Sequence, residues 1–204
     1  MGRRVWEELN QDWRHWPPRN ARTDIYLPEQ VGQDFRRRLG SWEHFTFLER
    51  LKVVRLVELS DGQVVEIGAT RIEPLRLAQE YVYAFLFETN GLRVLIAPDE
   101  LCGWTPPERL RGVDLAVLPM GVVEVDPLSG ERRIPPNHPL LKEEARFDET
   151  LRIVEGLSAR RVILTHIEEM NGLAYDDLLR LQERLQRQGY PIEFAFDTLL
   201  VDLD

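Results

Sequence analysis

The chain has 204 residues, 43% of them hydrophobic and 30% charged, which is enough for one domain with a packed core and excludes a disordered chain. Its net charge of −9 argues against general nucleic-acid binding, because phosphate contacts need clustered cations. Cys102 is the one cysteine, so no intrachain disulfide can form, and no apolar run approaches the roughly 18 residues of a membrane helix; a soluble cytoplasmic protein without a membrane segment is expected.

The N-terminal stretch predicts an amphipathic helix over residues 3–16, followed by a proline pair that ends it. Trp6, Trp13 and Trp16 recur on it at spacings near three and four. We expect a Trp-rich helical arm over residues 1–20, which either packs on the core or acts as a lid. A short strand at 25–27 and a helix at 29–39 are predicted next.

The remaining chain is rich in strands first and then alternates helices with strands. Residues 46–88 read as β structure, and the Asn90-Gly91 turn leads into a further strand. The later predicted elements are strands at 93–98, 113–119 and 161–165, helices at 147–156 and 175–188, and a closing strand pair at 192–203. This order predicts a layered α/β fold that forms a single domain over residues 1–204.

Polar side chains follow two of these strands at the point where each strand ends. Asp99 comes directly after the strand at 93–98, and His166 directly after the strand at 161–165. In layered α/β folds sites are built at the carboxyl ends of strands, and divalent metals accept carboxylate and imidazole ligands. We therefore expect both side chains at the ends of neighbouring strands, in one cleft and within about 8 Å of each other. Alternatively, Asp99 caps the following turn, and His166 is a hydrogen-bonded histidine with no metal role.

Other polar residues are weaker candidates. Glu168 and Glu169 follow His166 and either stay hydrated, cap a helix or orient the imidazole. His138 lies on a turn-rich loop, where it is either a surface histidine or a catalytic proton donor to a leaving oxygen. Cys102 lacks an identifiable base, so it is not expected to be a nucleophile.

Five segments carry a family resemblance. They are the aromatic strand at 83–88, the strand and aspartate at 93–99, the strand at 114–118, the strand and Thr-His-Ile at 161–167, and the segment at 194–197. In order and spacing the chain resembles a metallo-β-lactamase-fold hydrolase, in the branch of the cyclic-phosphate phosphodiesterases and ribonuclease Z. The resemblance implies an αββα sandwich with its site at the sheet edge. It also implies a centre of two metal ions, zinc or manganese, in which Asp99 bridges the ions and His166 binds one.

The sequence departs from the family pattern at three places. The first metal motif, His-x-His-x-Asp-His, is absent, residues 78–79 hold no histidine, and the closing Asp-Gly reads Asp197-Thr198. Met1 would stand directly after the absent motif, so we expect a fold that is incomplete at the N-terminus. Because two protein ligands rarely hold a metal tightly, we also expect weak or absent metal binding by this chain.

Two functions are compatible with these observations. The first is a metal-dependent hydrolase of a small-molecule or nucleotide phosphodiester, in which a metal-activated water attacks phosphorus once the absent motif is supplied. The second is a metal-poor relative that has kept the fold as a binding or assembly module. An incomplete fold would leave sheet edge and apolar surface uncovered, so we expect the Trp-rich arm or a second copy in a homo-oligomer to cover it.

Overall fold

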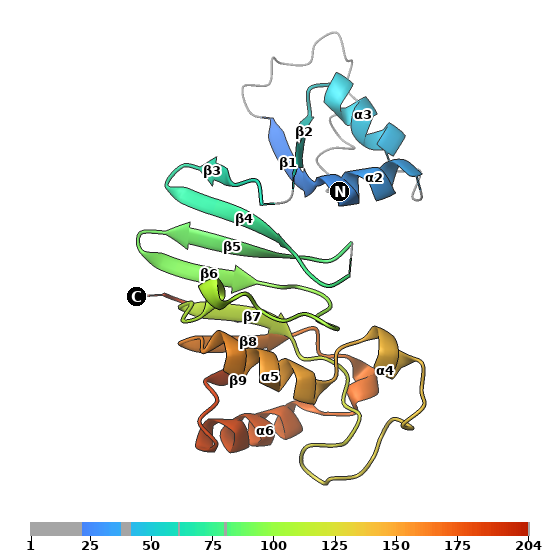
Figure 1. The fold of residues 1–204 in the computed structure, drawn as a ribbon, viewed down its shortest axis with the longest axis vertical. Helices are drawn as coiled ribbons and strands as arrows, with labels where there is room; N and C mark the ends of the chain where they lie inside the picture. Colours follow the sequence, from blue (N-terminus) through green and yellow to red (C-terminus); the bar gives the residue numbers. More distant parts are fainter. Residues whose placement is uncertain (1–21, 38–41, 61, 80, 204) are drawn as a thin grey trace. The chain divides into compact units, whose positions relative to one another are not determined.

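The computed structural model describes residues 22–37, 42–60, 62–79 and 81–203. They fall into two compact units that divide after Leu59 (Figure 1). The expected Trp-rich arm over residues 1–20 lies outside the described residues. The expectation of one domain over residues 1–204 stays a prediction.

The first unit is a parallel pair of strands with two helices between them in sequence. The predicted strand at 25–27 is part of β1 (Thr23–Pro28), which pairs with β2 (Val54–Leu59). The connecting helices are α2 (Glu29–Arg37) and α3 (Trp42–Arg50). The prediction that β structure begins at residue 46 was wrong, because Trp42, Phe45 and Leu48 recur every third residue and continue a helix instead. Leu48 is buried in this unit's own small core.

The second unit is built on one mixed sheet of seven strands in the order β3-β4-β5-β6-β7-β8-β9 (Figure 1). The strands are β3 (Val65–Ile67), β4 (Thr70–Arg76), β5 (Tyr83–Thr89), β6 (Leu92–Ile96), β7 (Leu115–Pro119), β8 (Arg161–Thr165) and β9 (Ile192–Phe194). Pairing is antiparallel from β3 to β6 and parallel from β6 to β9. The predicted hairpin turn is confirmed, since Asn90 and Gly91 both have positive φ.

Helices connect the parallel strands of this sheet. They are α4 (Leu140–Glu143), α5 (Phe147–Leu157) and α6 (Tyr175–Arg187), with 3-10 turns η2 (Glu108–Leu110) and η3 (Glu169–Asn171). α5 buries Thr150, Ile153, Val154 and Leu157, at the spacing of one helix face. At its first turn the Glu149 carboxylate accepts the N–H of Arg146 at 2.8 Å, which satisfies a donor that the helix leaves unpaired. The predicted α/β class is confirmed.

The end of the chain differs from its prediction. The expected strand pair over residues 192–203 is a single strand, β9, followed by irregular chain. Thr198 has a φ of 72°, which breaks the extended conformation, and Phe196 is 53% exposed. An alternating pattern shows that a segment can form a strand, but not that a partner strand is present.

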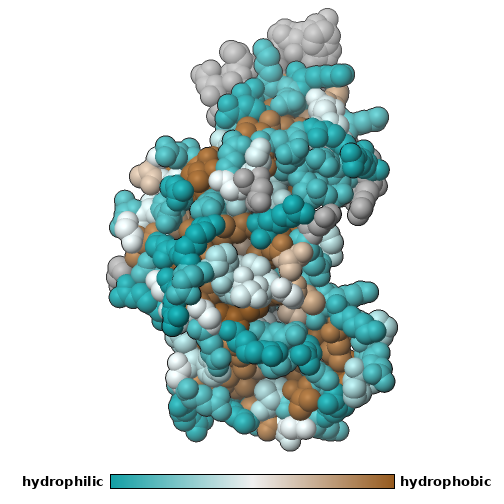
Figure 2. Space-filling model, viewed as in Figure 1, coloured by the Kyte–Doolittle hydropathy of each residue, from teal (hydrophilic) through white to brown (hydrophobic). Residues whose placement is uncertain are grey.

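The core of the second unit lies between the sheet and its helices. Leu95, Leu118 and Leu164 on adjacent strands are fully buried, as are Leu157 of α5 and Leu181 of α6. On the face shown in Figure 2 the surface is mainly hydrophilic with some hydrophobic patches, including patches over the α5 and α6 region at the bottom of the view. Among the described helices, none has the length and apolar character needed to cross a membrane.

Candidate functional site

The two predicted site residues meet at the carboxyl edge of the parallel strands. Asp99 follows β6 and His166 follows β8, and His166 Nδ1 lies 3.8 Å from Asp99 Oδ1. The prediction that their strands are neighbours was wrong, since β7 lies between β6 and β8. The expected proximity holds all the same, because strands that run parallel end at the same edge of the sheet and the side chains reach across β7.

His166 has an unusual backbone conformation. Its φ is 52°, in the left-handed region that costs a side chain about 1–2 kcal/mol. The flanking strand holds it there, because Thr165 O accepts the N–H of Met120 at 2.8 Å and Thr165 Oγ1 donates to Leu118 O at 3.2 Å. Strain of this kind is commonly found at functional sites. In this protein the left-handed conformation of His166 changes the direction of the chain sharply at the end of β8.

A second carboxylate faces the other nitrogen of the ring. Glu168 Oε1 lies 3.5 Å from His166 Nε2, so the imidazole stands between Asp99 and Glu168. Of the roles considered for the two glutamates after His166, orientation of the imidazole therefore fits Glu168. Glu168 makes no side-chain capping bond to η3, and Glu169 is exposed.

The turn after Asp99 is capped by Glu100. One oxygen, Glu100 Oε1, accepts the N–H groups of Leu101 at 2.6 Å and Ala145 at 2.8 Å, and that of Cys102 as well. The alternative role of Asp99 as the cap of this turn is thus filled by its neighbour. Asp99 itself is 63% exposed and its carboxylate points to His166.

Glu144 adds a further carboxyl group that the sequence did not reveal. Hydrogen bonding to Glu100 raises the pKa of Glu144 from 4.5 to about 7, and burial and the negative charges of Glu100, Glu168 and Asp99 add to the effect. Glu144 therefore holds a proton for much of the time near neutral pH. No local pattern marks it, because residue 144 reaches the site only through the folding of the loop before α5.

The floor of the site is fixed by close backbone packing. Gly121 has a φ of 79°, and a Cβ there would stand 2.6 Å from Ala145 O. The buried amide of Asn171 bridges to the same loop, with Oδ1 accepting the N–H of Val123 at 3.0 Å and Nδ2 donating to Gly121 O at 3.3 Å. These contacts join the segment after His166 to the loop after β7.

The resulting cavity is acidic and very small. The described residues that line it are Asp99, Glu100, Pro119, Gly121, Val122, Glu144, Ala145, His166 and Glu168. Four carry carboxyl groups and none is an arginine or lysine, so the cavity attracts cations and repels anions. Its volume of about 10 Å³ is that of one water molecule or ion. A substrate would have to lie outside it.

The fit to a metal ion is incomplete. Asp99 and His166 offer suitable donor types, close enough for one ion to approach both. However, no group of three or more histidine, cysteine, aspartate or glutamate side chains in the described part of the chain is arranged to hold a metal. The described residues therefore do not form a metal centre by themselves.

His138 and Cys102 lie outside the cavity lining. His138 is exposed on the loop after β7, and its Nδ1 accepts the N–H of Leu140 at 3.3 Å. Its proposed role as proton donor is not tested by this geometry. Burial and the nearby Glu100 raise the pKa of the Cys102 thiol, which makes the thiolate less available for nucleophilic attack.

Comparison with known proteins identifies the fold. A family model described as a beta-lactamase superfamily domain matches residues 11–167. Among solved structures, zinc-bound PqqB from Methylobacterium extorquens has a TM-score of 0.60 at 15% identity, over 89% of this chain and 65% of PqqB. A diphosphatase of the PhnP family has a TM-score of 0.55 at 19% identity, over 91% of this chain and 60% of the diphosphatase chain. The predicted α/β fold of metallo-β-lactamase type is confirmed.

Unliganded yeast PDE1 is a third similar structure, with a TM-score of 0.54 at 14% identity, over 89% of this chain and 60% of PDE1. The chain thus spans less than two thirds of each of these three structures. A search of curated proteins gave no match to the sequence.

Proposed function

Because this chain belongs to the beta-lactamase superfamily, we propose that it takes part in metal-dependent hydrolysis of a phosphodiester, at the edge of the sheet where β6 and β8 end. The observation that supports this most is the 3.8 Å approach of His166 Nδ1 to Asp99 Oδ1 across β7. One of the similar structures is named as a diphosphatase of the PhnP family, which supports a phosphate-containing substrate.

The charge of the cavity supports a requirement for a cation. An anionic phosphodiester would be repelled by Asp99, Glu100 and Glu168 unless a divalent cation neutralised them. Zinc or manganese, when bound in such a site, supplies a water of lowered pKa and a positive charge for the phosphate. Asp99 and His166 are the residues proposed to contact it, and further donors are needed to hold it tightly.

The chain's own groups have separate proposed tasks. Glu168 orients His166 through the 3.5 Å contact at Nε2. Glu144, which is hydrogen-bonded to Glu100 beside the site, is one group proposed to give a proton to a leaving oxygen. His138 is the second proposed proton donor, from its place on the long loop.

The test is hydrolysis of bis(p-nitrophenyl) phosphate with added zinc or manganese. We expect Asp99→Asn and His166→Gln each to lower the rate by roughly 100-fold or more, and a chelator to abolish it. His44→Gln is the matched control, because it makes the same exchange at an exposed histidine that does not line the cavity, and it should leave the rate unchanged. Equal rates for the parent and both site variants would contradict the proposal.

A binding or assembly module is the second candidate function. It is favoured by one observation, that no three potential ligands among the described residues are arranged around a metal. If the folded parent shows no metal-dependent hydrolysis and no metal retained after dialysis, while its thermal unfolding remains cooperative, this second function is preferred.

A further inference from the structure

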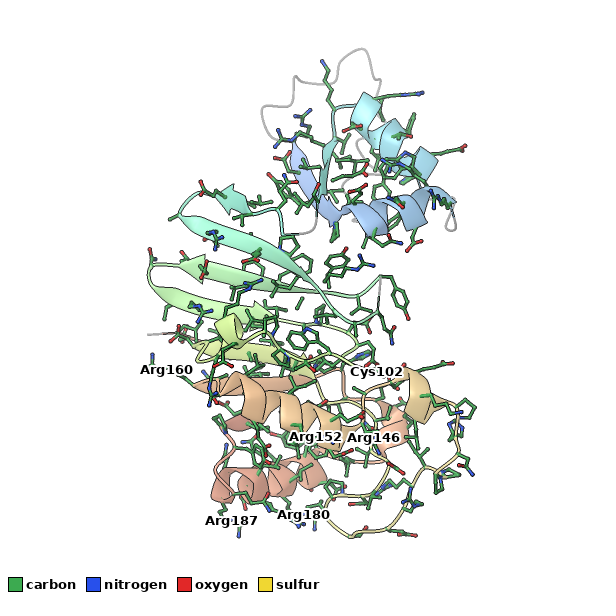
Figure 3. All side chains as sticks on the ribbon, viewed as in Figure 1. Cys102, Arg146, Arg152, Arg160, Arg180 and Arg187 are labelled. Carbon is green, nitrogen blue, oxygen red and sulfur yellow. The ribbon has the colours of Figure 1, made fainter. Side chains whose placement is uncertain are left out.

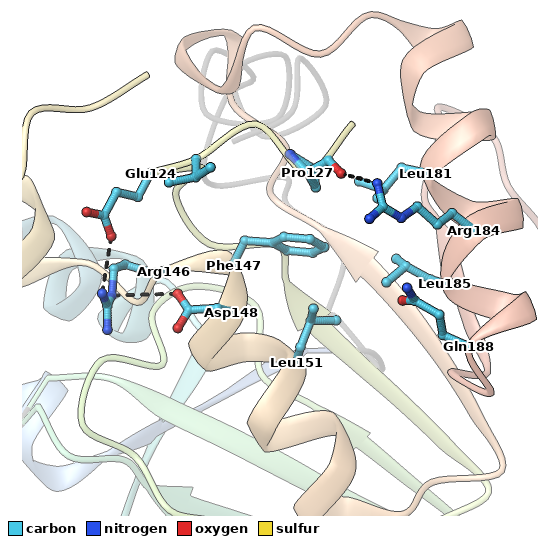
Figure 4. Close-up of a pocket in the computed structure, with 11 residues that line it drawn as sticks. Glu124, Pro127, Arg146, Phe147, Asp148, Leu151, Leu181, Arg184, Leu185 and Gln188 are labelled. Carbon is cyan, nitrogen blue, oxygen red and sulfur yellow. Dashed lines mark hydrogen bonds and ion pairs between the residues drawn. The ribbon is translucent and has the colours of Figure 1, made fainter. Parts of the chain in front are cut away.

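A groove separate from the Asp99–His166 cavity lies between α5, α6 and the loop at residues 124–127 (Figure 4). Its volume is about 400 Å³, within the range of small-molecule sites. The apolar residues that line it are Val125, Pro127, Phe147, Leu151, Leu181 and Leu185. None of its lining residues also lines the Asp99–His166 cavity.

Charges on one side of the groove are already compensated. Glu124 pairs with Arg146 at 3.1 Å and also with Arg132. Asp148 pairs with Arg152 at 2.8 Å and lies 3.7 Å from Arg146 Nε. Figure 4 shows Glu124, Arg146 and Asp148 on the far side of Phe147 from α6. Each acid there has an arginine partner. This side of the groove therefore has, among its described residues, no unpaired charge that would attract a charged ligand.

The other side carries a cation that has no acidic partner among the described residues. Arg184 Nη1 donates to Pro127 O at 2.6 Å, which places the guanidinium at the mouth of the groove (Figure 4). Arg184 is exposed, and it forms no ion pair with any residue in the described part of the chain. Gln188, four residues further along the chain at the C-cap of α6, lines the same mouth with an amide that can donate.

We propose that this groove binds a small amphipathic carboxylate, with its apolar body against Phe147, Leu151 and Leu185 and its carboxylate on Arg184 and Gln188. A guanidinium binds a carboxylate through two parallel N–H donors, and its interaction is strengthened where no competing acid is paired with it. One cation and one amide suit a monoanion, whereas a phosphate dianion would call for additional positive charge.

The volume of the groove also limits the size of the ligand. A volume of about 400 Å³ accommodates an apolar group of the size of a phenylalkyl chain. It is too small for a peptide or a lipid bilayer. The ligand class differs from the phosphodiester proposed for the Asp99–His166 cavity. The groove is therefore a second site, whose occupation does not depend on metal at the first.

The test is isothermal titration calorimetry with 4-phenylbutyrate as the probe. We expect one saturable site per chain with a dissociation constant of roughly 1 mM or tighter. The alcohol 4-phenylbutanol has the same apolar body without the charge, and should bind roughly tenfold more weakly or not detectably. Binding of the carboxylate should be unaffected by a chelator.

Three variants at exposed positions locate the site. Arg184→Gln and Gln188→Glu should each weaken binding of 4-phenylbutyrate by roughly tenfold, through loss of the cation and through repulsion. Arg187→Gln is the matched control, since it removes the same charge from the same helix at a residue that does not line the groove and projects outward from α6 (Figure 3). It should bind like the parent.

Several outcomes would overturn the proposal. One is the absence of saturable binding by the parent. Another is an Arg184→Gln variant that binds 4-phenylbutyrate as tightly as the parent does. A third is equal affinity for the acid and the alcohol, which would leave only an apolar groove with no place for a carboxylate. Because Arg184 and Gln188 are exposed, loss of folding should not obscure these results, and the thermal midpoint of each variant confirms this.

Discussion

The loop after β7 is held by one buried aspartate, and its substitution by asparagine is a sensitive test of the structure. Asp126 has only 7% of its side chain exposed. Its Oδ1 accepts the N–H groups of Leu128 at 2.8 Å and Ser129 at 3.1 Å, and its Oδ2 accepts Arg133 Nε at 3.1 Å. Asparagine keeps an oxygen for the two backbone donors, so Asp126→Asn removes mainly the charge that faces Arg133.

The size of the effect follows from the pKa of this carboxyl. Hydrogen bonding to Arg133, followed by the N–H groups of Leu128 and Ser129, lowers the pKa of Asp126 from 3.8 to about 2. At about 1.4 kcal/mol for each pH unit this corresponds to about 2.5 kcal/mol. Arg133 has 35% of its side chain exposed, so water screens part of the interaction. We expect Asp126→Asn to lower the free energy of unfolding by about 1–2 kcal/mol at pH 7.

The dependence on pH gives the sign of the effect. Because the folded pKa of Asp126 lies below the unfolded value of 3.8, its contribution is fully present above about pH 5 and is lost as the pH falls toward 2. Urea unfolding of parent and variant from pH 7 to pH 2.5 measures this. Glu183→Gln is the control, because that pair with Arg187 is 73% and 77% exposed and should contribute less than about 0.5 kcal/mol. Equal stability at pH 7, or a difference as wide at pH 2.5 as at pH 7, would refute the reasoning.

Two further predictions concern the packing around the candidate site, and urea unfolding at pH 7 checks both. Gly121→Ala should lower the free energy of unfolding by about 2–3 kcal/mol or more, since its Cβ would stand 2.6 Å from Ala145 O. Gly130→Ala has a similar φ of 76° but open space around it, so it should cost only about 1 kcal/mol, and equal losses at the two glycines would contradict the packing argument. Thr150→Val should be neutral or stabilise by up to about 1 kcal/mol, because Thr150 Oγ1 is buried with no hydrogen-bond partner among the described residues; a loss above about 1 kcal/mol would count against this.

The sequence was sufficient to predict the strands that end at the site. A short apolar run followed by a polar residue describes β6 with Asp99 and β8 with His166, because strands covered on both faces must be apolar and their ends must not be. The same reasoning could not give the strand order. Nothing local states that β7 lies between β6 and β8, since that follows from how the whole chain packs.

Long-range contacts explain what the sequence did not reveal. Glu144 belongs to the site because the loop before α5 folds back onto Glu100, across 44 residues of sequence. Its neighbours in sequence, Glu143 and Ala145, form no pattern that distinguishes it from an ordinary charged loop residue. Similarly, α3 was missed because its apolar residues run directly into those of the next segment, and the helical period is visible only when Trp42 is counted as its start.

A single oxygen atom, Glu100 Oε1, determines how two loops open. It accepts the N–H groups of Leu101, Cys102 and Ala145, so the chain after β6 and the chain before α5 share one acceptor. Amide protons that depend on the same acceptor become accessible to solvent in the same opening event. In hydrogen–deuterium exchange these three amides should therefore share one protection factor, although Ala145 is 43 residues away from Cys102. Their shared protection factor would report directly on the mobility of the wall of the acidic cavity.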